Sequence, residues 1–295
     1  MPGQFCDDTL RALQQFQGAR GLRTSAVCDE DCWKALVEAS WSLGDRLLVL
    51  TSPNLRGDDV AELQGSLARL GFDCGRVDGI FGPRSARALE DFQSNCGLPA
   101  DGVCGTQTVR VLSRVIGQTG DGPGIAIVRE RERLRHSPAT LSSLRVVVGQ
   151  FGGLSTITRA VCHQLRATGA FVITLDEPDP IIQARVANHF AAHAYLGFEA
   201  STGDTSVVHY YRVPTFESLG GRTMATCLTT ELAACRGLMI AEPAGMRLPV
   251  LRETRMPAVL CSLAPVRMAV DASPEISTAV FRALQRWTTE CSLTG

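Results

Sequence analysis

The chain has 295 residues, 45% of them hydrophobic, and a formal net charge of −1. This apolar content supports folded cores and excludes a disordered chain, and the near-neutral charge excludes a basic surface built for nucleic acid or an anionic membrane. At about 100–200 residues per domain, the length predicts two or three domains.

The first eight residues contain neither a basic flank nor the apolar core of a secretory signal. No apolar run reaches the roughly 18 residues that a membrane span needs. We therefore expect a cytoplasmic protein as the sequence is written, and an exported one if the true start lies upstream. In a cytoplasmic chain, most of the 11 cysteines are expected to be buried free thiols.

The first third of the chain contains an internal duplication, because residues 5–36 match residues 81–112 without a gap. In each copy, apolar residues at helical spacing predict a helix that ends at a glycine, followed by a second helix over 30–40 or 106–116. The matching pairs are Phe5 with Phe81, Leu13 with Leu89, Phe16-Gln17 with Phe92-Gln93, Gly21-Leu22 with Gly97-Leu98, Val27-Cys28 with Val103-Cys104, and Leu36 with Leu112.

The second copy is longer at its front than the first. Asp58 and Asp59 are expected to cap an additional helix, which Gly71 ends. A turn sequence follows at residues 77–83, where Asp-Gly and Gly-Pro pairs occur. We therefore predict a truncated first repeat over residues 1–42 and a second repeat of three short helices over residues 43–116.

Residues 60–112 include LQGSLARLGF, VDGIFGPRSARALEDFQ and GLPADGVCGTQTVRVL. This stretch resembles the peptidoglycan-binding domain that accompanies many cell-wall enzymes. The resemblance implies that peptidoglycan fragments or precursors are ligands, bound near Asp78, Gly79 and Phe81. The helical spacing also predicts Phe16, Phe81 and Phe92 as core residues, and paired repeats can serve in protein interaction, so these alternatives stay open.

Residues 117–143 are rich in glycine and then in charge, which predicts a linker. From residue 144 to 292, strands and helices alternate, which predicts an α/β domain with a central mixed sheet. The expected strands are 145–148, 171–175, 195–199, 206–211 and 257–263, and the expected helices are 155–168, 180–194, 218–236 and 273–289.

This second domain resembles the zinc-dependent type-3 N-acetylmuramoyl-L-alanine amidases. The resemblance includes the helix segment 185–188 and the approach to the last strand at 251–260. Together with the repeats, the domain order is similar to that of the CwlM-like family of actinobacteria. That family implies a cytoplasmic, non-lytic amidase homologue that stimulates MurA, the enzyme of the first committed step of precursor synthesis.

The resemblance also identifies where a catalytic zinc site would lie. A catalytic zinc needs three protein ligands and an open position for water, with a carboxylate as base. The family positions fall at Phe151 for the first histidine, Ser201 for the second histidine and Ser262 for the glutamate base. The glutamate ligand has no counterpart, because Gly153 is followed directly by Leu154. The resemblance therefore predicts neither catalytic residues nor a zinc cofactor.

Two histidines offer a different metal site. His189 and His193 are at positions i and i+4 of the predicted helix 180–194, which would place both rings on one face. A third ligand would have to come from His163, Glu199 or His209. Ordinary surface or core histidines explain the same pattern.

These residues favour a non-catalytic protein that binds peptidoglycan or its precursors, regulates a cytoplasmic enzyme of precursor synthesis of the MurA type, or does both. The alternative is an active zinc-dependent N-acetylmuramoyl-L-alanine amidase. A third hypothesis is a wall-binding protein exported from an upstream start.

Overall fold

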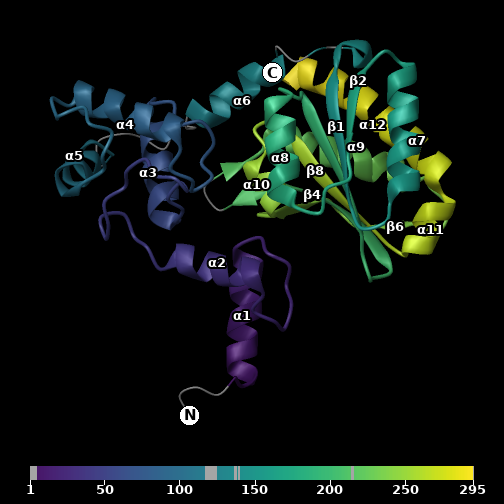
Figure 1. The fold of residues 1–295 in the computed structure, drawn as a ribbon, viewed down its shortest axis with the longest axis horizontal. Helices are drawn as coiled ribbons and strands as arrows, with labels where there is room; N and C mark the ends of the chain where they lie inside the picture. Colours follow the sequence, from purple (N-terminus) through teal and green to yellow (C-terminus); the bar gives the residue numbers. More distant parts are fainter. Residues whose placement is uncertain (1–4, 117–124, 136–137, 139, 214–215, 295) are drawn as a thin grey trace. The chain divides into compact units, whose positions relative to one another are not determined.

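The computed structural model describes residues 5–116, 125–135, 138, 140–213 and 216–294 (Figure 1). The chain forms two compact units, mainly residues 1–129 and mainly residues 130–295. The boundary between them falls inside the predicted linker 117–143, of which residues 117–124 lie outside the described residues. No helix in the described ranges is both long and apolar enough to cross a membrane.

The first unit is helical, and the predicted second helices of both copies are confirmed. Its elements are α1 (Asp7–Ala19), α2 (Glu30–Ala39), α3 (Asp58–Arg69), α4 (Pro83–Asn95) and α5 (Thr106–Ile116). The expected cap of α3 is wrong, because Gly57 is the N-cap and makes no side-chain hydrogen bond there. Asp58 and Asp59 instead lie in the first turn, where carboxylates stabilise a helix by interacting with the positive end of its dipole.

A buried glutamine holds the turn after a helix at three places in the first unit. The side-chain oxygen of Gln17 accepts from the Ser25 amide at 2.8 Å, and that of Gln93 accepts from the Gly102 amide at 2.9 Å. Gln64 makes the same contact with the Gly79 amide at 2.8 Å. The glutamines therefore satisfy backbone groups of the turns, which explains why Gln17 and Gln93 match in the duplication.

The second unit has an eight-stranded sheet with the central order β2-β1-β3-β8-β4-β5, and β6 and β7 pair with β4. β1, β2, β3 and β8 are parallel, whereas β4 runs antiparallel to β8, so the predicted mixed sheet is confirmed. The strands are β1 (Arg145–Phe151), β2 (Phe171–Leu175), β3 (Ala194–Ala200), β4 (Thr205–Val213), β5 (Phe216–Glu217), β6 (Met239–Ile240), β7 (Ala244–Met246) and β8 (Ala258–Leu263).

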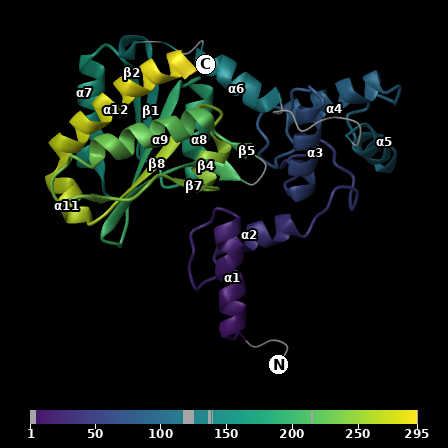
Figure 2. The same cartoon turned by 180° about the vertical axis from the view of Figure 1, so that it is seen from behind.

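Helices cover both faces of this sheet. α9 and α12 lie across one face in Figure 2, and α8 and α10 lie near the other in Figure 1. The helices from α6 onward are α6 (Ile125–Arg135), the short 3₁₀ turn η1 (Leu141–Ser143), α7 (Ser155–Ala167), α8 (Pro180–His189), α9 (Leu219–Leu232), α10 (Pro249–Glu253), α11 (Val266–Asp271) and α12 (Ser273–Thr294).

The main core lies between the sheet and α7, α9 and α12. Trp287 on α12 is fully buried, and its indole N–H donates to the Gly220 carbonyl on α9 at 3.1 Å. A Cβ atom at Gly220 would lie 2.7 Å from Pro257 and 2.8 Å from Leu134. Glycine at position 220 therefore allows Pro257 and Leu134 to pack closely against α9, and the Gly220 carbonyl satisfies the buried indole.

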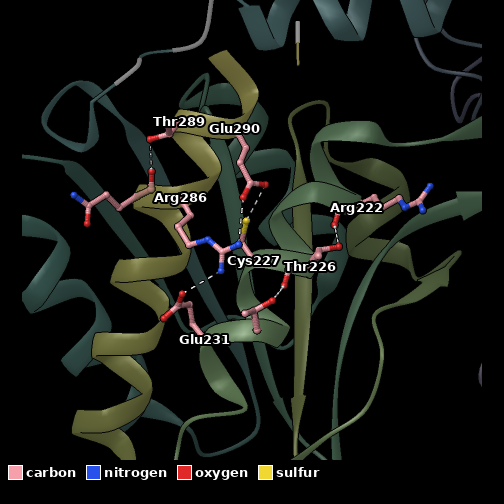
Figure 3. A network of polar contacts seen from close by, with 9 residues as sticks. Arg222, Thr226, Cys227, Glu231, Arg286, Thr289 and Glu290 are labelled. Carbon is pink, nitrogen blue, oxygen red and sulfur yellow. Dashed lines mark hydrogen bonds and ion pairs between the residues drawn. The ribbon is translucent and has the colours of Figure 1, made fainter. Parts of the chain in front are cut away.

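A polar network joins α9 to α12 at the rim of this core (Figure 3). Arg286 lies 3.3 Å from both Glu231 and Glu290, and the Cys227 thiol donates to Glu290 at 3.5 Å. Arg286 is 45% exposed, so these ion pairs contribute little to stability. The buried apolar surface around Trp287 therefore provides most of the attachment of α12.

The ten cysteines whose side chains the structure describes are all free thiols, and seven of them are buried, so the prediction of mostly buried thiols is confirmed for these ten. Burial raises the pKa of Cys74, Cys104, Cys227 and Cys261 to about 12. Cys6 is exposed, and hydrogen bonding to Thr9 lowers its pKa.

Thiol labelling of the native protein is expected to separate these two classes, because only an exposed thiolate reacts readily. With a disulfide reagent at pH 8, Cys6 and Cys28 should react first, and Cys227 and Cys261 should react only after unfolding in guanidinium. Peptide mapping by mass spectrometry would identify the labelled sites. Labelling of Cys261 at the rate of Cys6 in native buffer would show that the sheet core is open.

Candidate functional site

The positions assigned to the zinc site come together at the carboxyl ends of three neighbouring parallel strands. Phe151 at the end of β1 pairs with Glu199 on β3, and Glu199 pairs with Ser262 on β8. Partners in register point to the same face of a sheet. Phe151, Glu199 and Ser262 therefore form a row across β1, β3 and β8, which we call the strand-end row.

Glu199, and not Ser201, is the β3 residue of the strand-end row. Ser201 follows β3 by one residue, and its amide donates to the Leu263 carbonyl at 2.9 Å. From the sequence, Glu199 was expected only as a possible partner of two histidines. Alternation along β3 gives Glu199 the same face as Tyr195 and Gly197, but its place in the row depends on the register with β1 and β8.

The carboxylate of Glu199 is 8% exposed and accepts a short hydrogen bond from the Ser262 hydroxyl. A buried carboxylate needs such a donor, because burial without one costs several kcal/mol, on the order of 3 or more. Burial and the neighbouring Glu199 carboxylate together raise the pKa of Tyr195, which lies on the same face. The row thus presents one hydrogen-bonded carboxylate between a phenyl ring and a hydroxyl.

A second polar layer supports the row from α8. The Tyr195 hydroxyl donates to Gln183 at 2.7 Å, and Gln183 donates to the Gln150 carbonyl at 2.9 Å. Gly149 makes room for this contact, because a Cβ atom there would lie 1.8 Å from the Gln183 oxygen and 2.5 Å from the Tyr195 hydroxyl. The contact therefore requires glycine at this position of β1.

The connection from β1 to α7 is a tight turn. Only Gly152, Gly153 and Leu154 separate the two elements, and both glycines have positive φ angles of 86° and 76°. Leu154 is fully buried, and its amide donates to Gln150 at 2.6 Å. This turn has no side chain able to act as the glutamate ligand of the zinc amidases.

The strand-end row does not fit a catalytic zinc. Phenylalanine has no ligand atom, serine is a poor zinc ligand, and the one carboxylate, Glu199, is engaged by Ser262. On its β4 side, Ser262 pairs with Val207, which also has no ligand atom. In the described ranges, no group of three His, Cys, Asp or Glu side chains is placed to hold a metal ion.

The alternative histidine pair does not lie on one helix. α8 ends at His189, and the predicted continuation to residue 194 is wrong. His193 instead precedes β3, where its Nδ1 accepts from the Arg145 amide at 3.0 Å. Burial and the nearby Arg145 charge lower the pKa of His193.

The proposed third ligands of that pair lie on other elements. His209 on β4 pairs with Leu260, and His163 lies on α7. Glu199 belongs to the strand-end row. These residues therefore provide no shared metal site.

In the first unit, the turn Asp78–Gly79 is built around Gln64. Gln64 donates to the Asp78 carboxylate at 3.0 Å and accepts from the Asp78 and Gly79 amides at 3.0 and 2.8 Å. Gly79 has a φ of 71°, which favours glycine. Phe81 is fully buried, so it is a core residue and has no surface for direct contact with a ligand.

Two segments that resemble the amidases are hydrogen-bonded to each other. The Asn188 side chain on α8 donates to the Glu253 carbonyl and accepts from the Arg255 amide, both at 2.8 Å. The approach to β8 is therefore fixed to α8 at the amino end of β8, whereas the strand-end row lies at its carboxyl end.

Comparison with known proteins gives matches in both units. Residues 56–112 match the PG_binding_1 family, the peptidoglycan binding domain. N-acetylmuramoyl-L-alanine amidase CwlM of Mycobacterium tuberculosis is 31% identical in an alignment of 301 positions, gaps included. The alignment covers 91% of this chain and 73% of CwlM. A spore cortex-lytic enzyme of Bacillus cereus is 48% identical over 56 residues, which cover 19% of this chain and 22% of the enzyme.

Among solved structures, the catalytic domain of the amidase CwlV from Bacillus (Paenibacillus) polymyxa superposes with a TM-score of 0.41 at 17% identity, covering 49% of this chain and 98% of that domain. The family match over residues 56–112 and the 31% identity with the amidase CwlM define an amidase-type protein with a peptidoglycan-binding domain. Since the 31% identity extends over 73% of CwlM, the chain belongs to the CwlM family.

Proposed function

We propose that this protein is a non-catalytic amidase homologue that binds peptidoglycan or its precursors and regulates a cytoplasmic enzyme of precursor synthesis. The observation that carries the proposal is the strand-end row. The resemblance assigns Phe151 and Ser262 to the positions where the zinc chemistry of the family needs a ligand and a base, and Glu199 lies between them in the sheet. Three ligands and a metal-bound water are required for that chemistry, and the row supplies one carboxylate.

The peptidoglycan-binding part of the proposal is supported by the second repeat. Residues 56–112 match a peptidoglycan binding domain, and in this region α3 contacts α4 and α5 and holds the Asp78–Gly79 turn through Gln64. Binding to purified sacculi, measured by co-sedimentation of the full chain, tests this part. Binding to sacculi is expected to persist in the presence of a metal chelator, because the proposal assigns no metal to the binding site.

The regulatory part of the proposal is supported by membership of the CwlM family. The proposed target is a MurA-type enzyme, which works in the cytoplasm. Adding the purified full chain to a purified MurA-type enzyme is expected to change its turnover rate. An unchanged rate over a range of protein concentrations above that of the enzyme would remove this target and leave the binding role.

The experiment that tests the absence of catalysis combines metal analysis with a cleavage assay. Protein purified without chelator is expected to contain less than stoichiometric zinc, and it should release no stem peptide from muropeptides after zinc is added. An active zinc amidase assayed in parallel provides the positive control. One zinc per chain together with release of stem peptide would overturn the proposal and support the active amidase.

A variant locates the metal in that second outcome. Suppose that zinc is bound and cleavage occurs. Glu199→Gln is then expected to abolish zinc binding and cleavage if the strand-end row holds the metal, and to leave both intact if the metal lies elsewhere. A matched change at an exposed carboxylate, Glu242→Gln, should leave both unchanged. Loss in the first variant alone would place an active site in the row and contradict the proposed function.

A further inference from the structure

An open cavity of about 280 Å³ lies between α7 and β2, on elements apart from the strand-end row. β2 is the edge strand of the sheet, so one side of this region has no neighbouring strand. The cavity is lined by Arg159, Cys162, His163, Arg166, Ala167 and Thr174.

Three basic side chains of the lining are spaced along one face of α7. Arg159, His163 and Arg166 occupy positions i, i+4 and i+7, which are neighbours on a helix surface. Neither α7 nor β2 contains an acidic residue. The guanidinium charges of Arg159 and Arg166 therefore have no acidic residue on these two elements, and a bound anion would offset them.

The hydrogen bonds of the two arginines leave their charges without a carboxylate partner. Arg159 donates to the Ser155 carbonyl at 3.1 Å, and Arg166 donates to the Val172 carbonyl at 3.0 Å. In the part of the chain that the structure describes, no carboxylate forms an ion pair with either arginine. Carbonyl acceptors orient a guanidinium group but do not neutralise it.

The cavity also has polar atoms that restrain one of the arginines. The Thr174 hydroxyl lies 3.4 Å from Arg166 and 3.2 Å from the Cys162 thiol. Arg166 is therefore held by β2 at two points, through Val172 and Thr174, before any ligand arrives. A donor that is already oriented loses less conformational entropy on binding than a free side chain.

We infer that this cavity binds a phosphoryl group. A guanidinium group presents paired N–H donors that match the oxygens of phosphate. A phosphate carries about −1.5 to −2 charges at pH 7, compared with −1 for a carboxylate, and so matches the charge of the two arginines more closely. The cavity volume of about 280 Å³ lies just below the range of about 300–1,000 Å³ that is typical of sites for drug-sized molecules. This size favours a small phosphate or the phosphate end of a larger molecule.

Isothermal titration calorimetry of the full chain with inorganic phosphate, glycerol 3-phosphate and acetate at constant ionic strength tests the inference. Saturable binding of phosphate or of the phosphomonoester, with acetate at least about tenfold weaker, is the expected result. Stronger binding of glycerol 3-phosphate would identify a phosphomonoester as the ligand class, and stronger binding of phosphate would identify the free ion. Equal binding of acetate, or no saturation with either phosphate, would overturn the inference.

Arg159→Gln provides the variant, because Arg159 is exposed and its side chain donates to a carbonyl of its own helix. Its dissociation constant for phosphate is expected to rise about tenfold or more, because a hydrogen bond to a charged group is lost. Arg282→Gln removes the same charge from an exposed position on α12 and should change the constant less than about twofold. Equal weakening in both variants would mean general charge attraction and would overturn the site.

Discussion

Replacing Arg46 with leucine is expected to lower the free energy of unfolding of the first unit by about 3–5 kcal/mol. Arg46 donates to both carboxylate oxygens of Asp59, at 2.7 and 3.1 Å, and to the Arg56 carbonyl at 2.7 Å. Asp59 is fully buried, and its carboxylate also accepts from the Val60 amide at 2.8 Å. Loss of the guanidinium would leave a buried carboxylate without its counter-ion.

The loss is expected to come mainly from the unpaired charge and not from the attraction itself. The double variant Arg46→Leu with Asp59→Leu removes both charges, and it should recover much of the lost stability. Lys34→Ala breaks an exposed ion pair with Glu30 and should leave the stability of the unit nearly unchanged.

Urea unfolding, monitored by hydrogen exchange of the α3 amides, gives the unfolding midpoint of the first unit for all three variants. An Arg46→Leu midpoint equal to that of Lys34→Ala would show that Asp59 is solvated. A double variant less stable than Arg46→Leu alone would show that packing, and not charge, is the main contribution of this pair.

The helices of the first unit were predictable because their patterns are local. The duplication, the apolar spacing and the terminating glycines all lie within single segments, and the helices over 30–40 and 106–116 are found within one residue of their predicted ends. The cap of α3 was not predictable in the same way. Asp59 looks like a capping residue in sequence, but its carboxylate is directed to Arg46, which lies 13 residues earlier.

The end of α8 shows how a tertiary contact overrides local propensity. Residues 190–193 contain no proline or glycine, so nothing in the sequence ends the helix there. In the structure, the His193 amide donates to the Arg145 carbonyl at 2.7 Å, and Ala191 adopts a positive φ of 50°. Pairing with β1 ends the helix, and the distance between these segments along the chain hides it from a local pattern.

Only part of the strand-end row could be predicted from the sequence. Phe151 and Ser262 were assigned through the resemblance to the amidases, Phe151 because it precedes Gly152-Gly153 and Ser262 because it lies near the end of the predicted strand 257–263. Glu199 was missed because its place in the row depends on the register between strands separated by many residues. The short strands β6 and β7 were missed for a simpler reason, since two or three residues show no periodicity.

The second large stability effect is expected at Gln64, the buried glutamine that holds the Asp78–Gly79 turn. Gln64→Ala is expected to lower the free energy of unfolding of the first unit by about 3–4 kcal/mol, because the turn amides and carbonyl that Gln64 satisfies would be left unpaired in a buried place. Gln64 is 1% exposed and donates to the Ile80 carbonyl at 3.0 Å and to Ser85 at 3.0 Å. Gln107→Ala, at an exposed position on α5, should cost almost nothing.

A second glutamine separates loss of stability from loss of the binding turn. Gln93→Ala removes an equivalent set of bonds from the turn at residues 101–103, where Gln93 contacts Asp101 at 2.8 Å and Val103 at 3.0 Å. If the Asp78–Gly79 turn forms the peptidoglycan site, Gln64→Ala should lose sacculus binding under conditions in which both variants remain folded by circular dichroism. Gln93→Ala should keep it. Equal binding by the two variants would place the peptidoglycan site elsewhere, because only one of them releases the turn at Asp78.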